Sequence, residues 1–196
     1  MARDLRHARL ELQAATDAVA RTSNARNRDE FEVAWRAYLS SLEKCWVKLE
    51  RVCHGAKGFQ HWQKPIKQRR ASDPVLRYLF QARHVDQHTL REILEHVPGS
   101  TEIRVVGPPV GPVFVEHLEI VNGRVVDYAG SHPLEERITP ARLELVPIEN
   151  RGNVCQPPHS HLGAPLADAT PMGVAVLGLR FCSDLLSDAE KRFGAG

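Results

Sequence analysis

The N-terminal half of the chain repeats apolar residues every three to four positions, which places them on one side of an α-helix. The clearest run begins after Asp29, a suitable N-cap, and ends near His54-Gly55. A weaker run covers 5–21, and a third begins at Ser72-Asp73-Pro74 and continues to about His96. The second run contains Phe31, Trp35, Tyr38, Leu42, Cys45, Trp46, Leu49 and Cys53, and the third Leu76, Leu79, Phe80, Leu90, Ile93, Leu94 and Val97.

Beyond residue 100 the repeat changes to the alternation typical of β-strands with one buried face. Residues 101–106 and 142–148 are expected to be strands. Residues 113–121 and 124–128 flank Asn122-Gly123, the dipeptide most typical of a two-residue hairpin turn. The sequence therefore predicts a small antiparallel sheet within 101–150.

A last helix is expected to begin at Thr170-Pro171, with an apolar stripe that suits packing back on the N-terminal helices. The predicted fold class is α+β: an N-terminal antiparallel helical bundle, a small antiparallel β segment and a C-terminal helix. The corresponding ranges are 1–97 for the helical unit, 101–150 for the β segment, 151–170 for a linker rich in proline and glycine, and 171–196 for the last helix.

The chain has 196 residues and a formal net charge of +2. This charge is smaller than that of proteins that coat DNA, so contact with nucleic acid requires a local patch. The sequence shows neither a leader-like apolar stretch near its start nor a membrane-spanning segment, and we expect a cytoplasmic protein without a membrane partner. The four cysteines form no CxxC pair and are expected to be reduced and mostly buried.

The most specific pattern is the run Arg-His-Val-Asp-Gln-His from Arg83 to His88, inside the third predicted helix. On a helix, His84 and His88 lie one turn apart on the same side, and Asp86 follows Arg83 by almost one turn. Histidine exchanges protons near neutral pH, and arginine can hold two oxygens of a phosphate. Because RNA carries its own nucleophile, the 2′-hydroxyl, these side chains could cleave it without a metal or other cofactor.

This run resembles the signature of the HEPN superfamily (higher eukaryotes and prokaryotes nucleotide-binding), an Arg and a His separated by a few residues. A polar residue usually follows the Arg of that signature, and His84 stands there in this chain. The segment 73–79 and the helix that carries Trp35 and Trp46 are similar to some uncharacterised bacterial members. The resemblance covers residues 1–97 and leaves out the β segment.

The resemblance implies a homodimer whose Arg and His residues meet in one RNA-cutting cleft. Many members are toxins or defence effectors, so an antitoxin or another protein is a candidate partner. In this interpretation the chain is an endoribonuclease. Its general base or acid is His88, its phosphate-binding group is Arg83, and His84 or Asp86 orients His88.

Two other interpretations of the same residues remain open. Arg83, His84, Asp86 and His88 are also consistent with the solvated face of an amphipathic helix. The alternative function is a non-enzymatic interaction module, in which the helical half forms dimers or binds a partner and the hairpin offers a strand edge.

A basic segment, 57–70, lies between the second and third predicted helices, and Pro65 should limit any helix within it. The candidate RNA-binding residues are Lys64, Lys67, Arg69 and Arg70 for phosphates and Trp62 for stacking on a base. The alternative is a solvated linker whose tryptophan is held in the core.

Two groups of residues have the types or spacing of metal ligands. His84 and His88 are correctly spaced, but no third ligand lies nearby in the sequence. Cys155, His159 and His161 could hold a metal together with a residue of the sheet, although a loop held by hydrogen bonds is the favoured interpretation. We therefore expect no metal site.

Overall fold

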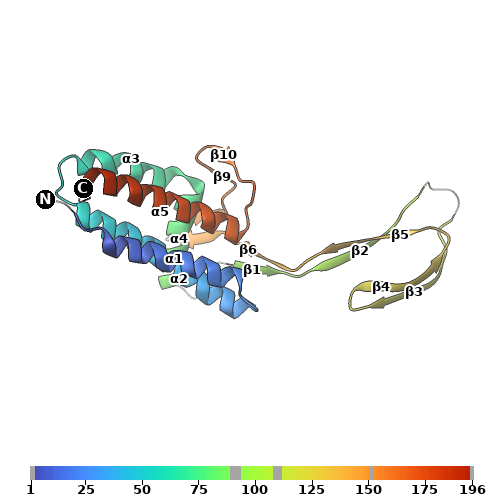
Figure 1. Ribbon diagram of the computed structural model, residues 1–196. Coiled ribbons are helices and arrows are strands. Elements are labelled where there is room, and N and C mark those ends of the chain that lie inside the picture. Colours follow the sequence, from blue (N-terminus) through green and yellow to red (C-terminus); the bar gives the residue numbers. More distant parts are fainter. Residues whose placement is uncertain (1–2, 89–93, 108–111, 151, 195–196) are drawn as a thin grey trace. The chain divides into compact units, whose positions relative to one another are not determined.

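The computed structural model describes residues 3–88, 94–107, 112–150 and 152–194, with only the backbone described for 86–88. The described residues form an α+β fold, as predicted, with five helices and ten short strands (Figure 1). The chain divides into unit 1, residues 1–95 and 144–196, and unit 2, residues 96–143. The helices, all in unit 1, are α1 (Arg6–Ser23), α2 (Arg28–Cys53), α3 (Phe59–Ser72), α4 (Pro74–His88) and α5 (Pro171–Phe193).

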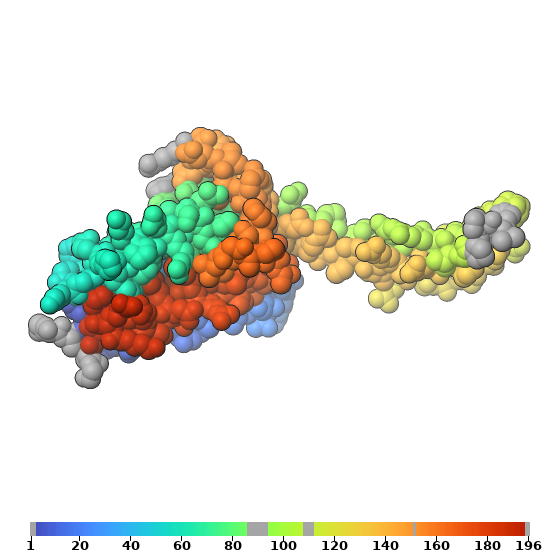
Figure 2. Space-filling view, turned by 90° about the horizontal axis from the view of Figure 1, so that it is seen from above, coloured from blue at the N-terminus to red at the C-terminus, as the bar shows by residue number. Residues whose placement is uncertain are grey.

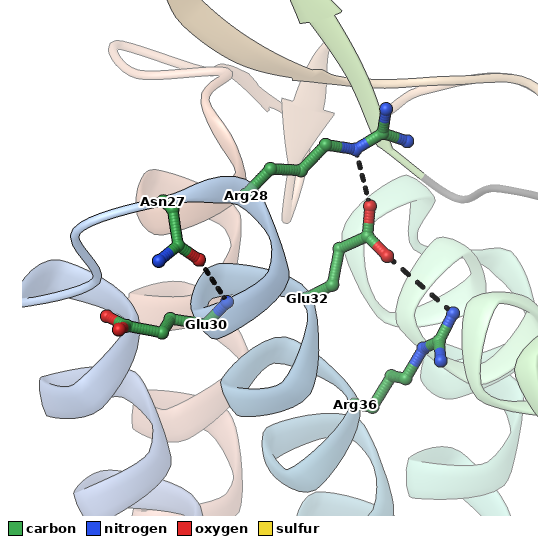
Figure 3. A network of polar contacts seen from close by, with 5 residues as sticks. All are labelled: Asn27, Arg28, Glu30, Glu32 and Arg36. Carbon is green, nitrogen blue, oxygen red and sulfur yellow. Dashed lines mark hydrogen bonds and ion pairs between the residues drawn. The ribbon is translucent and has the colours of Figure 1, made fainter.

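The N-terminus of α2 is capped by Asn27 and not by Asp29, so the predicted cap was wrong by two residues. The side-chain oxygen of Asn27 accepts a hydrogen bond from the backbone nitrogen of Glu30 at 2.9 Å (Figure 3). Asp29 lies in the first turn, where a negative charge interacts favourably with the helix dipole. Glu32 then pairs with Arg28 at 2.6 Å and with Arg36 at 3.8 Å, which adds one-turn ion pairs along the exposed side of the helix.

The core of unit 1 forms where α2, α4 and α5 meet. The hydroxyl of Tyr38 in α2 donates a hydrogen bond to the carbonyl of Ala175 in α5 at 3.1 Å. Gly178 allows this close approach, because a Cβ atom at that position would collide with Tyr38 and with Leu79 of α4. The last helix therefore packs on the N-terminal helices. The largest fully buried side chains of the chain include Trp35, Tyr38, Tyr78, Phe59, Leu39, Leu49 and Leu94.

The basic segment is a continuous helix, α3, although Pro65 lies inside it. A proline at this position cannot donate the helical hydrogen bond, which normally weakens a helix interior. Phe59 and Trp62, however, pack their rings against Phe193 of α5 at centroid distances of 5.9 and 5.4 Å. This burial outweighs the local cost of Pro65, and the expectation that Pro65 would limit a helix here was wrong.

The third predicted helix is shorter than its apolar pattern indicates. Helix α4 ends at His88, and the next described element is the strand β1 (Leu94–Val97), which pairs with β6 (Arg142–Leu145). Leu94 reaches the core, at 1% exposure, from a strand and not from a helix. A short apolar run fits either element, and Pro98 disfavours helical geometry at the residue before it. The helix predicted over the last residues of 74–96 was therefore wrong. Two members of its stripe, Leu90 and Ile93, lie outside the described residues.

The strands of unit 2 form antiparallel pairs. The predicted hairpin turn is confirmed, because Asn122 and Gly123 both have positive φ, 52° and 74°. The sequence analysis did not predict the strand β5, which follows this hairpin. The single sheet expected over 101–150 is divided into separate two-stranded pairs among the described residues. These pairs are β3 (Val115–Val121) with β4 (Arg124–Gly130), and β2 (Ser100–Val105) with β5 (Leu134–Thr139).

The chain that follows β6 belongs to unit 1. The hydroxyl of Tyr78 in α4 donates to the carbonyl of Val146 at 2.8 Å, and the Asn150 side chain donates to Gln81 at the same distance. The chain after β6, which was predicted to belong to the β segment and the linker, therefore covers one side of α4. Its strands are β7 (Ile148–Asn150), β8 (Asn153–Cys155), β9 (Ser160–His161) and β10 (Ala164–Pro165).

Candidate functional site

Helix α4 holds Arg83 beside the core and leaves its Nε atom without a hydrogen-bond partner among the described residues. Val85 and Ala82 on the same helix are buried, with exposures of 3% and 0%, and they mark the side that packs on the bundle. Arg83 is half-buried, and its Nε atom is buried without a hydrogen-bond partner among the described residues. Buried nitrogen donors are nearly always paired, so this unpaired guanidinium nitrogen lacks an acceptor that the described residues do not supply.

The other members of the Arg83 motif are described less fully. The His84 ring lies edge-on against the Phe80 ring, with 4.5 Å between the ring centroids. Asp86 and His88 continue the backbone of α4, but their side chains lie outside the described residues. The expected convergence of Arg83 with His88 therefore stays a prediction, as does the orienting role of Asp86.

The basic residues of α3 differ in their contacts. The Arg70 guanidinium pairs with Glu43 and lies over the Trp46 ring, 4.6 Å from its centroid. Lys67 forms an ion pair of 2.7 Å with Glu50. Because both cations already have partners in α2, they hold α3 against the bundle.

These contacts change the predicted RNA-binding surface. Trp62 is 7% exposed and its Nε1 donates to Asp188 at 2.6 Å, so its ring is not available to stack on a base. This corrects its expected role and agrees with the alternative of a tryptophan held in the core. Lys64 and Arg69 are exposed and have no ion pair among the described residues. Of the candidate RNA-binding residues in α3, these two have a positive charge that no carboxylate among the described residues pairs with.

A second polar cluster joins the start of α4 to the loop at β9. Asp73, before the first turn of α4, accepts a hydrogen bond from the backbone nitrogen of Leu76 at 3.0 Å. Its other oxygen accepts from the backbone nitrogen of Leu162 at 2.7 Å, and His161 Nδ1 lies 2.9 Å from Oδ1. The favoured interpretation of this loop, that hydrogen bonds hold it, is confirmed.

The carboxylate of Asp73 stays ionised although it is 6% exposed. Burial raises its pKa, but the hydrogen bonds from Leu162, Leu76 and His161 outweigh burial and lower the pKa below its usual value. An ionised carboxylate only accepts hydrogen bonds, so Nδ1 of His161 must carry the proton in this contact. The bond therefore fixes the orientation of the imidazole and leaves Nε2 for another partner.

The sequence did not reveal this cluster as one site. Asp73 was recognised as part of the helix start Ser72-Asp73-Pro74 and His161 as part of a loop, but the two residues are 88 positions apart. No periodic pattern joins them, because their contact depends on how the loop folds over the helix start. A histidine in a loop rich in proline and glycine was the only local signal.

No group of three or more His, Cys, Asp or Glu side chains among the described residues could hold a metal ion. The four cysteines are buried and free of disulfides, as expected. No helix in this part of the chain is long and apolar enough to cross a membrane.

The chain was compared with protein-family models, with curated proteins and with solved structures. None of these comparisons finds a match.

Asp73→Asn should lower the free energy of unfolding by about 1–3 kcal/mol at about pH 7, because the amide cannot accept all three hydrogen bonds. The wild-type contribution of Asp73 is present above its unfolded pKa and is lost as pH falls through the lower folded pKa. Urea unfolding of both proteins at about pH 7 and about pH 3 measures this difference, which should shrink in acid. A difference that is the same at both pH values would contradict the assigned ionisation.

Proposed function

We propose that this chain is a HEPN-like RNA-binding protein that cleaves RNA without a metal, with Arg83 and His88 as its catalytic residues. The observation that supports this proposal most directly is the buried Nε of Arg83, which has no partner among the described residues. The guanidinium stands five residues before a histidine on one continuous helix. A phosphodiester oxygen is the type of acceptor that would satisfy it.

The proposed reaction is an internal transfer of the phosphodiester. The 2′-oxygen attacks the neighbouring phosphorus while His88 takes the proton of the 2′-hydroxyl, and the bond from phosphorus to the 5′-oxygen breaks. Arg83 stabilises the negative charge on the phosphorane-like transition state. In a homodimer, the second copy of the chain supplies the imidazolium that protonates the departing 5′-oxygen. The products carry a 2′,3′-cyclic phosphate and a 5′-hydroxyl.

The test is incubation of the purified full chain with single-stranded and structured RNA in the presence of EDTA. Cleavage should continue in EDTA, and the products should have 2′,3′-cyclic phosphate ends. DNA of the same sequence should stay intact because it lacks the 2′-hydroxyl. Cleavage that stops in EDTA, or equal cleavage of DNA, would contradict the mechanism.

A second candidate function, a non-enzymatic interaction module, is favoured by the exposed apolar side chains of unit 2. Phe114, Val115 and Leu118 lie in or next to β3 and are 61%, 52% and 41% exposed. Among the described residues β3 pairs only with β4, so no larger sheet covers these side chains. Isolated hairpins are marginally stable in water, and exposed apolar surface of this kind is typical of binding surfaces. Intact RNA after exposure to the wild-type chain would favour this second candidate.

A further inference from the structure

A cavity of about 540 Å³ lies between α3, α5 and the loop that contains β9 and β10. We call it the α3–α5 pocket. The three elements meet on the face of unit 1 shown in Figure 2, where α3 is green-blue, α5 red and the loop orange. The pocket has the size of sites that bind small organic molecules. None of its lining residues belongs to the Arg83 motif, so the pocket is a separate site.

Two arginines give the α3–α5 pocket an excess of positive charge. Arg69 from α3 and Arg180 from α5 both line it, and neither has an ion pair among the described residues. Asp188 also lines the pocket, but it already accepts hydrogen bonds from Trp62 at 2.6 Å and from Arg192 at 2.9 Å. The remaining carboxylate, Asp184, offsets one of the two free guanidinium groups. An anion that binds between the two arginines balances the charge of the second guanidinium group.

His161 supplies a third polar group from the loop. Its side chain is 13% exposed and lines the pocket, while its Nδ1 is held by the carboxylate of Asp73. Nε2 has no hydrogen bond among the described residues. When the ring is protonated, this nitrogen becomes a donor whose orientation is already fixed.

The rest of the pocket wall is apolar. Ile66, Leu177 and Phe181 line it, and the Phe181 ring offers a surface for a flat organic group. Donors from three different elements suit a tetrahedral anion with several oxygens better than a planar carboxylate. We propose that the α3–α5 pocket binds a small phosphomonoester. Arg69, Arg180 and His161 hold its phosphate, and the apolar wall holds its organic group.

Titration of the full chain with phenyl phosphate tests this assignment by calorimetry and by backbone NMR shifts. Phenyl phosphate should bind at one saturable site and shift resonances near Arg69 and over 177–188. Inorganic phosphate should bind more weakly because it lacks the ring, and benzyl alcohol should bind more weakly because it lacks the charge. Tighter binding of phenylacetate than of phenyl phosphate would overturn the choice of phosphate.

The variants Arg69→Ala and Arg180→Ala should each weaken binding of phenyl phosphate roughly tenfold or more. Both arginines are exposed and unpaired among the described residues, so thermal unfolding should stay near that of the wild type. Arg21→Ala removes the same charge from the exposed end of α1 and should leave binding unchanged. Arg83→Ala should also leave it unchanged, which separates this pocket from the proposed catalytic site at Arg83 and His88. Absence of saturable binding to the wild type, or equal weakening by Arg21→Ala, would overturn the proposal.

Discussion

His88→Ala should lower the rate of RNA cleavage by about 10²–10⁴-fold, the usual contribution of a general acid or base. Arg83→Ala should lower it by about 10²–10³-fold, the usual contribution of one group that stabilises charge in the transition state. Arg83→Ala removes the guanidinium that would hold the scissile phosphate, and His88→Ala removes the group that would take the proton of the 2′-hydroxyl. Arg83→Lys should recover only part of the rate, because a lysine cannot bind two phosphate oxygens with a planar fork. Single-turnover cleavage of a labelled RNA measures these effects.

The matched control is Arg77→Ala, which removes an exposed arginine from the same helix and should leave the cleavage rate unchanged. Circular dichroism should show the same helix content in all these proteins. Wild-type rates in His88→Ala would exclude the proposed acid–base role. Equal loss of activity in Arg77→Ala would assign the effect to net charge and not to a specific phosphate contact.

Trp35→Ala should lower the free energy of unfolding by about 3–5 kcal/mol, as expected for the loss of a large buried ring. Trp35 is 1% exposed and lies against Tyr38, with 5.3 Å between the ring centroids. For a chain of this length, the loss should lower the melting temperature by roughly 6–20 °C. Calorimetry and urea unfolding measure the change.

Trp35→Phe is the informative control, because the Nε1 atom of Trp35 is buried without a hydrogen-bond partner among the described residues. Phenylalanine leaves a smaller cavity than alanine and also removes the unpaired donor, whose burial costs about 1–3 kcal/mol. Its destabilisation should therefore be less than half that of Trp35→Ala. Similar losses in both variants would mean that the indole nitrogen has a partner in solution.

The sequence predicted those elements whose pattern is long or whose turn chemistry is specific. Helix α2 repeats buried residues over seven turns, so its type was predicted correctly and its ends to within two residues. The turn at Asn122-Gly123 was found because both residues tolerate positive φ. The helix start at Ser72-Asp73-Pro74 and the start of α5 at Thr170-Pro171 were also correct, because short polar side chains and proline have strong preferences at helix starts.

The incorrect predictions have a common physical cause, which is long-range packing. Pro65 disfavours a helix locally, but the burial of Phe59 and Trp62 keeps α3 continuous. Leu94 follows the apolar pattern of α4, yet it enters the core from a strand that pairs with β6, about fifty residues later. The contact of Asp73 with His161 arises in the same way. These outcomes depend on which distant segments meet, and spacing in the sequence does not encode that information.

The split of unit 1 along the chain has a consequence for its synthesis on the ribosome. The hydrogen bond from Tyr38 to Ala175 joins residues 137 positions apart, and the whole of unit 2 is translated between them. Helices α1 to α4 therefore emerge first, with the apolar surface that α5 later covers still open to water. A nascent chain that stops before residue 171 therefore exposes the apolar surface that chaperones bind, because α5 is not yet present to cover it.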